Sequence, residues 1–263
     1  MAATLEKWID DQQTRGKYTF LRAEAIQGSG LTPEAAKKAL QRLERHGRVA
    51  KAKNYFFVVV PLEYHSAGAP PPAWFIHDLM AAMKLPYYVG LLTAAGLHGA
   101  SPQQPQEFQV VTDRSVRPIM VGRVRLRFFA SKYVVGAATV KLKTPTGSIQ
   151  VSSPETTALD LVRFAKAVGH LDHVAEVVAE LSPSLRPGKL LTAVRLVGDV
   201  PNTQRLGYIL DLIHARQLAD PIRAWVRRQD PRPVPLRSGR LANAAEENGR
   251  WHVLVNEPLE IEA

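Results

Sequence analysis

The sequence predicts an α+β fold in which an N-terminal winged helix-turn-helix precedes a mixed domain with a small β-sheet and a mostly helical C-terminal part. Residues 1–65 run through three helical patterns and end in a two-stranded ribbon. Between about 107 and 151 the apolar residues alternate, and between about 154 and 229 they recur at helical spacing with Pro or Gly boundaries. The proline-rich stretch 66–72 separates the expected domains, 1–65 and 73–263.

The first two helices follow from apolar spacing. Leu5 and Ile9 share one face of a surface helix about three turns long. Thr19 is expected to cap a second helix over residues 20–27, which the Gly28-Ser29-Gly30 turn would end.

The third helix carries the clearest start signal. Thr32 can cap it, Pro33 suits its first position, and Gly47 suits its end. Lys and Arg are frequent at the outward positions of this helix and in the two strands of the wing that follows it. These side chains neutralise phosphates, while Gln41 and Arg42 can make paired hydrogen bonds to base edges. The sequence therefore predicts DNA contact at Lys37, Lys38, Gln41, Arg42, Arg45, Lys51 and Lys53. An ordinary solvated helix face is the alternative.

A second basic feature lies in the expected sheet, because residues 114–154 contain no Asp or Glu. Arg123, Arg125 and Arg127 are spaced by two and should project from one face, with Val124, Leu126 and Phe128 toward the core. This surface could bind nucleic acid or an acidic protein, or could be an ordinary solvated face. Its candidate residues are Arg114, Arg117, Arg123, Arg125, Arg127 and Lys132.

The remaining elements follow from periodicity and breakers. Helices are expected over 74–84 and 87–97, then from Pro154, with Ser153 as its cap, to about 168. Others are expected over 170–181, 187–197, 202–218 and 221–229. Residues 230–238 are expected to form an extended linker or a surface loop, and residues 251–255 a strand that could join the sheet at its edge.

Composition narrows the function classes. The chain has no cysteine, which excludes disulfides and thiolate chemistry, and its formal net charge of +10 favours a polyanionic partner. No apolar run reaches the roughly 20 residues of a membrane span, so we expect a cytoplasmic protein without membrane association.

Catalytic and metal motifs are absent from the sequence. No nucleotide-binding loop, nucleophile elbow or zinc-protease signature occurs, and no cofactor is expected. His170, Asp172 and His173 form the densest group of potential metal ligands but should project in different directions, so no metal site is expected. Asp211 and His214 are expected to make a helical i,i+3 contact.

Several segments resemble the AbiEi family of antitoxins, the regulatory halves of abortive-infection toxin-antitoxin pairs that serve in phage defence. The resemblance rests on the following stretches: ALQRLERHGRVAKAKNYFFVV, YYVGLLTAAGLHGA, EFQVVT, GRVRLRFF, SPETTALDLV and the closing WHVLVNEPLEIE. It implies a non-enzymatic protein that binds inverted repeats in its own promoter and represses transcription. It also implies a nucleotidyltransferase-like toxin as partner, counteracted through the larger C-terminal domain.

Two other functions remain open from the residues alone. One is a nucleic-acid-processing enzyme, such as a nuclease, that a winged helix targets to its substrate. The other is a protein-interaction module that uses the basic sheet. Binding to inverted repeats would need two copies of the chain, so a dimer on DNA is expected.

Overall fold

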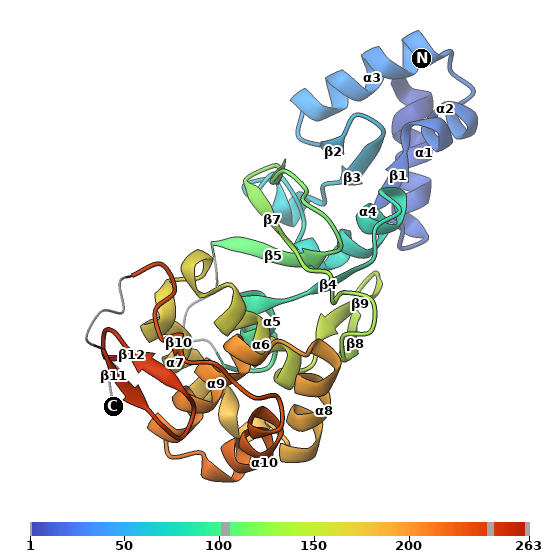
Figure 1. Ribbon diagram of the computed structural model, residues 1–263. Helices are drawn as coiled ribbons and strands as arrows, with labels where there is room; N and C mark the ends of the chain where they lie inside the picture. The colour runs from blue at the N-terminus through green and yellow to red at the C-terminus, as the bar shows by residue number, and fades with distance from the viewer. Residues whose placement is uncertain (1, 101–105, 241–244, 261–263) are drawn as a thin grey trace. The chain divides into compact units, whose positions relative to one another are not determined.

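The computed structural model describes residues 2–100, 106–240 and 245–260 and has the predicted α+β class (Figure 1). The chain forms two compact units and passes between them several times. Unit 1 comprises residues 1–88, 106–132 and 141–150, and unit 2 comprises 89–105, 133–140 and 151–263. The proline-rich stretch 66–72 lies within unit 1, where the Arg123 N–H donates to the Ala67 carbonyl at 3.0 Å. The boundaries 1–65 and 73–263 stay a prediction.

Residues 2–59 hold three helices and a small antiparallel sheet in the order expected for a winged helix. The elements are α1 (Ala2–Thr14), β1 (Thr19–Leu21), α2 (Arg22–Ser29), α3 (Pro33–Arg45), β2 (Val49–Lys53) and β3 (Phe56–Val59), with sheet order β1-β3-β2. Leu5 and Ile9 of α1 pack with Leu40 and Leu43 of α3 in one buried cluster with Phe57. Burial of this apolar stripe fixes which face of α3 remains outside.

The predicted start of the second helix is wrong. Thr19–Leu21 is a strand paired with β3, and Phe20 stacks on Phe57 with ring centroids 5.6 Å apart. Aromatic cross-strand pairing stabilises this extended conformation more than a helical first turn could. The helix begins at Arg22, where the Glu24 carboxylate accepts a hydrogen bond from the Leu21 N–H at 2.6 Å.

The central sheet confirms the strands expected between 107 and 151 and adds one before them. Its strands are β4 (Tyr87–Val89), β5 (Glu107–Thr112), β6 (Ile119–Val121), β7 (Val124–Ala130), β8 (Thr139–Thr144) and β9 (Gly147–Ser152), ordered β6-β7-β5-β4-β9-β8. Residues 87–97 are therefore not one helix. Val89 pairs with Val151 in a parallel ladder, and α5 (Leu91–Leu97) follows Gly90. Two tyrosines and a valine after Pro86 favour a strand.

Among its described residues, unit 1 contains one further α-helix, α4 (Ile76–Ala82), which is shorter than the expected 74–84, and the 3-10 helices Leu62–Tyr64 and Pro72–Trp74. Unit 2 is mostly helical. Besides α5 it contains α6 (Pro154–Arg163), α7 (His170–Leu181), α8 (Pro187–Val197), α9 (Val200–Leu212) and α10 (Arg216–Arg227). The Ser153 hydroxyl caps α6 as predicted, accepting from the Thr156 N–H at 3.2 Å. This helix ends at Arg163 rather than near residue 168.

The boundary between the last two helices lies earlier in the sequence than predicted. The break falls at Ile213–Ala215, where His214 has a φ of 60° and the Ala215 N–H donates to the Leu210 carbonyl at 2.8 Å. Pro221 does not start a helix but lies inside α10. A proline there removes one backbone hydrogen bond, and burial of the apolar stripe that includes Ile222 offsets that loss.

A third sheet forms near the C-terminus, with order β10-β12-β11. Its strands are β10 (Val234–Pro235), β11 (Glu246–Asn248) and β12 (Val253–Val255). The expectation that the closing strand joins the edge of the central sheet is wrong, because β12 pairs parallel to β10 and antiparallel to β11. Within the segment 230–238, expected as merely extended, β10 is a strand. Residues 261 and 262 of the closing motif lie outside the described residues.

Candidate nucleic-acid interface

The basic face of α3 is held outward by its cap and its buried stripe. The Thr32 hydroxyl accepts from the Ala35 N–H at 3.3 Å, as predicted, and Leu40 and Leu43 are buried. Lys37, Lys38, Gln41 and Arg45 are exposed, and Arg42 is half-buried. All five predicted α3 residues thus lie on the side of the helix away from the core.

Two hollows flank this face. The larger, of about 610 Å³, lies toward the turn between α2 and α3 and is lined by residues that include Lys38, Gln41, Arg42 and Arg45. The smaller, of about 300 Å³, lies between α3 and the wing. Its lining includes Arg22, Lys37, Gln41, Glu44, Lys51 and Asn54. Gln41 lines both hollows, so its amide occupies the middle of the exposed face.

The wing brings one acid near these cations. The Lys51 ammonium lies 3.8 Å from the Glu44 carboxylate, and both side chains remain partly exposed. A pair of this kind in solvent contributes little to stability, so the lysine remains available to a phosphate. Lys53 is half-buried beside the bulge that interrupts the β2–β3 ladder.

Arg22 is a residue of this surface that sequence reasoning misses. Its guanidinium carbon lies 5.9 Å from the centroid of the Phe57 ring, and its Nε is buried without a hydrogen-bond partner among the described residues. The prediction misses Arg22 because the helix expected over residues 20–27 places it within the helix rather than at its first position. Arg22 is in fact the first residue of α2, after a strand that pairs with the wing.

The second basic surface is less cationic than the sequence suggests. Arg125 and Arg127 lie on one face, as predicted, and both pair with the Glu107 carboxylate at 3.2 Å. Glu107 comes from β5, whose parallel register places it opposite Arg125. Arg123 precedes the strand in an exposed turn. Arg114 pairs with its neighbour Asp113 at 3.0 Å. Arg117 and Lys132 are exposed.

The predicted inward face of β7 needs correction. Leu126 is fully buried, but Val124 and Phe128 are only half-buried. Phe129, on the arginine face, is 6% exposed and packs under the Arg127 guanidinium, whose carbon lies 5.0 Å from the ring centroid. Packing on both sides of the strand end disrupts the simple alternation.

The histidine-rich start of α7 is explained by ion pairs. The Asp172 carboxylate accepts two hydrogen bonds from Arg237 at 2.6 and 2.7 Å, which lower the pKa of this carboxyl. His173 faces Glu176 at 3.4 Å. In the described part of the chain, no three His, Cys, Asp or Glu side chains group closely enough to hold a metal. The Asp211 carboxylate accepts from Arg250 and from the Trp251 indole. Its i,i+3 contact with His214 is a backbone one, in which the His214 N–H donates to the Asp211 carbonyl at 3.1 Å.

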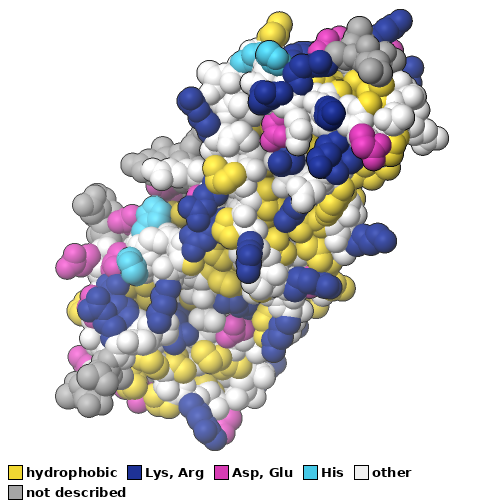
Figure 2. All heavy atoms as spheres, turned by 90° about the horizontal axis from the view of Figure 1, so that it is seen from above, with side chains coloured by type: hydrophobic (Ala, Val, Ile, Leu, Met, Phe, Trp, Pro, Cys, Tyr) yellow, Lys and Arg dark blue, Asp and Glu magenta, His cyan; other side chains and the backbone are white. Residues whose placement is uncertain are grey.

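Charge alone does not single out an interface. Lys and Arg side chains are spread over the face drawn in Figure 2, with apolar patches between them. In the chain as a whole, 34 Lys and Arg residues face 24 Asp and Glu residues. The α3 face is distinguished by its element order and its flanking hollows rather than by charge density.

Comparison with known proteins finds one family match. Residues 88–212 match the family model described as the AbiEi antitoxin C-terminal domain. This match supports an AbiEi family antitoxin. The AbiEi domain begins at β4 and ends with α9, and it supports an antitoxin role in a toxin-antitoxin system. No protein of curated function matches the chain by sequence.

The fold is also found in a solved structure. The crystal structure of the RV2827C protein from Mycobacterium tuberculosis aligns with a TM-score of 0.65 at 12% identity, covering 94% of this chain and 90% of that one. At this identity the likeness establishes the fold alone. No helix in the part of the chain that the structure describes has the length and apolar character needed to cross a membrane.

Proposed function

We propose that the protein is a DNA-binding antitoxin and transcriptional autorepressor that counteracts a nucleotidyltransferase-like toxin encoded beside it. The AbiEi domain supports the antitoxin part of this proposal. The observation that carries the DNA-binding part is the exposed face of α3, with cations on both sides of Gln41 and a hollow along each flank. The protein would act in the cytoplasm, without enzymatic activity, as a dimer on inverted repeats.

The residues on this face suit two kinds of DNA contact, one with phosphates and one with bases. Lys38, Arg45 and the wing lysines suit contacts with phosphates, which position a protein without reading sequence. Gln41 and Arg42 lie near the middle of the face and can each make paired hydrogen bonds to base edges. Arg22 adds a cation at the start of α2, on the wing side of the recognition helix.

DNA binding is tested by titrating the full chain against the upstream promoter region over a series of salt concentrations. Removing one phosphate contact should lower the slope of log affinity against log salt by about 0.9. We expect this change for Lys38→Ala and Arg45→Ala. The matched control is Arg195→Ala, because Arg195 is an exposed cation of α8 in unit 2.

Gln41→Ala tests base reading in the same assay. We expect the preference for the operator over a scrambled duplex to fall by about 5-fold to 150-fold, the equivalent of about 1 to 3 kcal/mol, with the salt slope unchanged. Unchanged affinity and slope in the α3 variants, or equal losses in Arg195→Ala, would contradict the assignment of this face.

The antitoxin activity is tested separately, by co-expressing the full chain with the neighbouring toxin gene. If the two functions reside in different parts of the chain, Lys38→Ala with Arg42→Ala abolishes operator binding and leaves rescue from the toxin intact. Absence of rescue by the unaltered chain would remove the antitoxin proposal without affecting the DNA-binding result.

We also propose that the Arg125 and Arg127 face extends the DNA contact beyond the winged helix. Arg125 and Arg127 share the carboxylate of Glu107, so two positive charges face one negative charge in this contact. Replacing both arginines with alanine should lower the salt slope in the promoter assay. Loss of toxin rescue with an unchanged slope would instead assign this face to a protein partner.

A further inference from the structure

A cavity of about 640 Å³ lies within unit 2, and none of the residues discussed for DNA binding lines it. Its walls come from the end of α6 with the short 3-10 helix Ala165–Ala167 that follows, the start of α7, the first turns of α9 and the loop 236–240. The cations that line it are Arg163, Lys166, Arg205, Arg237 and Arg240, and the acids are Asp172 and Glu257. The lining is therefore strongly cationic.

Three of the five cations are already paired. Arg163 contacts Asp160 at 3.1 Å and Asp199 at 3.3 Å. Arg237 makes the two-pronged pair with Asp172. Arg240 lies 2.5 Å from the Glu257 carboxylate. These pairs build the walls of the cavity, and their charge is largely neutralised.

The other two cations have no ion pair with any residue that the structure describes. Lys166 is exposed, and its ammonium reaches across the cavity to Gly239, whose φ is 88° and where a Cβ would lie only 2.6 Å from that nitrogen. Arg205 is held by bonds from its Nε to the carbonyls of Pro235 and Leu236 and from one Nη to Asn202. Its second Nη makes no hydrogen bond within the described residues.

The environment of these two charges favours an anion. Burial lowers the pKa of Arg205, which means that its positive charge is partly desolvated and gains from an anionic partner. The first turn of α7 also lines the cavity, and no side chain caps it. The lining also includes the apolar residues Phe164, Leu171 and Leu236.

We infer that this cavity binds a nucleoside triphosphate. Lys166 and Arg205 would hold the phosphate chain, and the half-buried Phe164 would contact the nucleoside. The volume falls within the roughly 300 to 1,000 Å³ of small-molecule sites, and a few convergent polar groups together with apolar lining residues are typical of them. This inference does not rest on DNA binding by α3 and would give the C-terminal part a ligand of its own.

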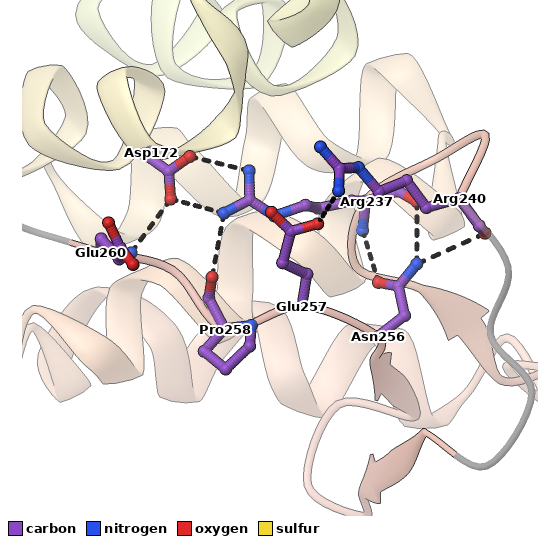
Figure 3. Close-up of polar contacts among 7 residues, drawn as sticks. All are labelled: Asp172, Arg237, Arg240, Asn256, Glu257, Pro258 and Glu260. Atoms are coloured by element: carbon purple, nitrogen blue, oxygen red, sulfur yellow. Dashed lines mark hydrogen bonds and ion pairs between the residues drawn. The ribbon is translucent and has the colours of Figure 1, made fainter.

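The network in Figure 3 shows how the cavity keeps its shape. Arg237 joins the loop 236–240 to α7 through Asp172 and to the C-terminal segment through the Pro258 carbonyl, at 2.9 Å. The Asn256 side chain closes the loop by accepting from the Arg237 N–H at 3.0 Å. The Glu257 carboxylate faces both Arg237 and Arg240. A phosphate that approached Arg240 would therefore compete with the Glu257 carboxylate.

The proposal is tested by calorimetric titration of the full chain with ATP, ADP, adenosine and tripolyphosphate at low ionic strength. We expect saturable binding of ATP, weaker binding of ADP and no detectable binding of adenosine. Lys166→Ala should weaken ATP binding about 10-fold, the equivalent of one charge-assisted hydrogen bond. Glu257→Gln should strengthen it several-fold by freeing Arg240.

Two controls separate this site from general attraction to a basic protein. Arg195→Ala removes an exposed cation outside the cavity and should leave the affinity unchanged. Lys38→Ala with Arg42→Ala should leave it unchanged as well. No saturable ATP binding by the unaltered chain, or equal weakening by Lys166→Ala and Arg195→Ala, would overturn the proposal. Equal affinity for tripolyphosphate and ATP would overturn the nucleoside contact at Phe164.

Discussion

Gly207→Ala should destabilise unit 2 although alanine is the better helix former. Gly207 lies in α9, and a Cβ there would sit 2.1 to 2.3 Å from three atoms of the Trp251 ring. Trp251 is fully buried, and its indole N–H donates to the Asp211 carboxylate at 2.6 Å. The ring must therefore move by about 1.3 Å to regain ordinary contact at 3.4 Å, and this movement breaks the hydrogen bond.

The magnitude follows from three contributions. Alanine gains about 1 kcal/mol over glycine in a helix interior. Overpacking a core costs about 1 to 3 kcal/mol, and losing a hydrogen bond to a charged acceptor costs about 1.5 to 3 kcal/mol. The free energy of unfolding should therefore fall by about 1.5 to 5 kcal/mol. Gly188→Ala is the matched control, since Gly188 lies in α8 and a Cβ added there would meet no atom within 4 Å, and it should stabilise by about 0.5 kcal/mol.

Urea denaturation followed by circular dichroism measures both variants. Because both glycines lie in unit 2, they should move the same transition in opposite directions. In a Trp251→Ala background the indole is gone, and Gly207→Ala should then stabilise, which is a coupling that additive effects cannot produce. A destabilisation by Gly207→Ala that persists in that background would refute the packing argument.

Three further changes have defined outcomes. Thr32→Ala removes the cap of α3 and should lower the free energy of unfolding by about 1 kcal/mol, which amide exchange in that helix would report as faster exchange. The control Thr192→Ala, on the exposed face of α8, should not destabilise the protein. Burial raises the pKa of Tyr87 to about 12, so stability is lost as pH rises from about 10 through 12, and an ultraviolet difference titration against Tyr87→Phe should show that midpoint. The hydrogen bonds from Arg237 lower the pKa of Asp172, so they stabilise the fold at neutral pH, and this stabilisation is lost as the pH falls below the usual Asp range. In acid titrations, Asp172→Asn should therefore lose less free energy of unfolding than the unaltered chain. Equal acid sensitivity in the two proteins would contradict the last expectation.

The sequence by itself determined the elements whose signals are local. Thr32 before Pro33 predicts the start of α3, because a hydroxyl cap and a proline act within one turn. The alternation along β5, β7 and β9 predicts strands, and Ser153 before Pro154 predicts α6. The stretches EFQVVT, GRVRLRFF and SPETTALDLV carry part of the resemblance to AbiEi antitoxins, and they lie within the family match over 88–212.

Only the tertiary structure decided the contacts made with distant segments. Thr19–Leu21 became a strand because β3 lies beside it, and that moved Arg22 to the start of α2. Glu107 neutralises part of the arginine face because the register of β5 and β7 places it opposite Arg125, although Glu107 lies outside the acid-free stretch. Trp251 fills the space above Gly207, 44 residues away in the sequence. Local propensity cannot encode such partners, since each depends on which side chain the folded chain brings within a few ångströms.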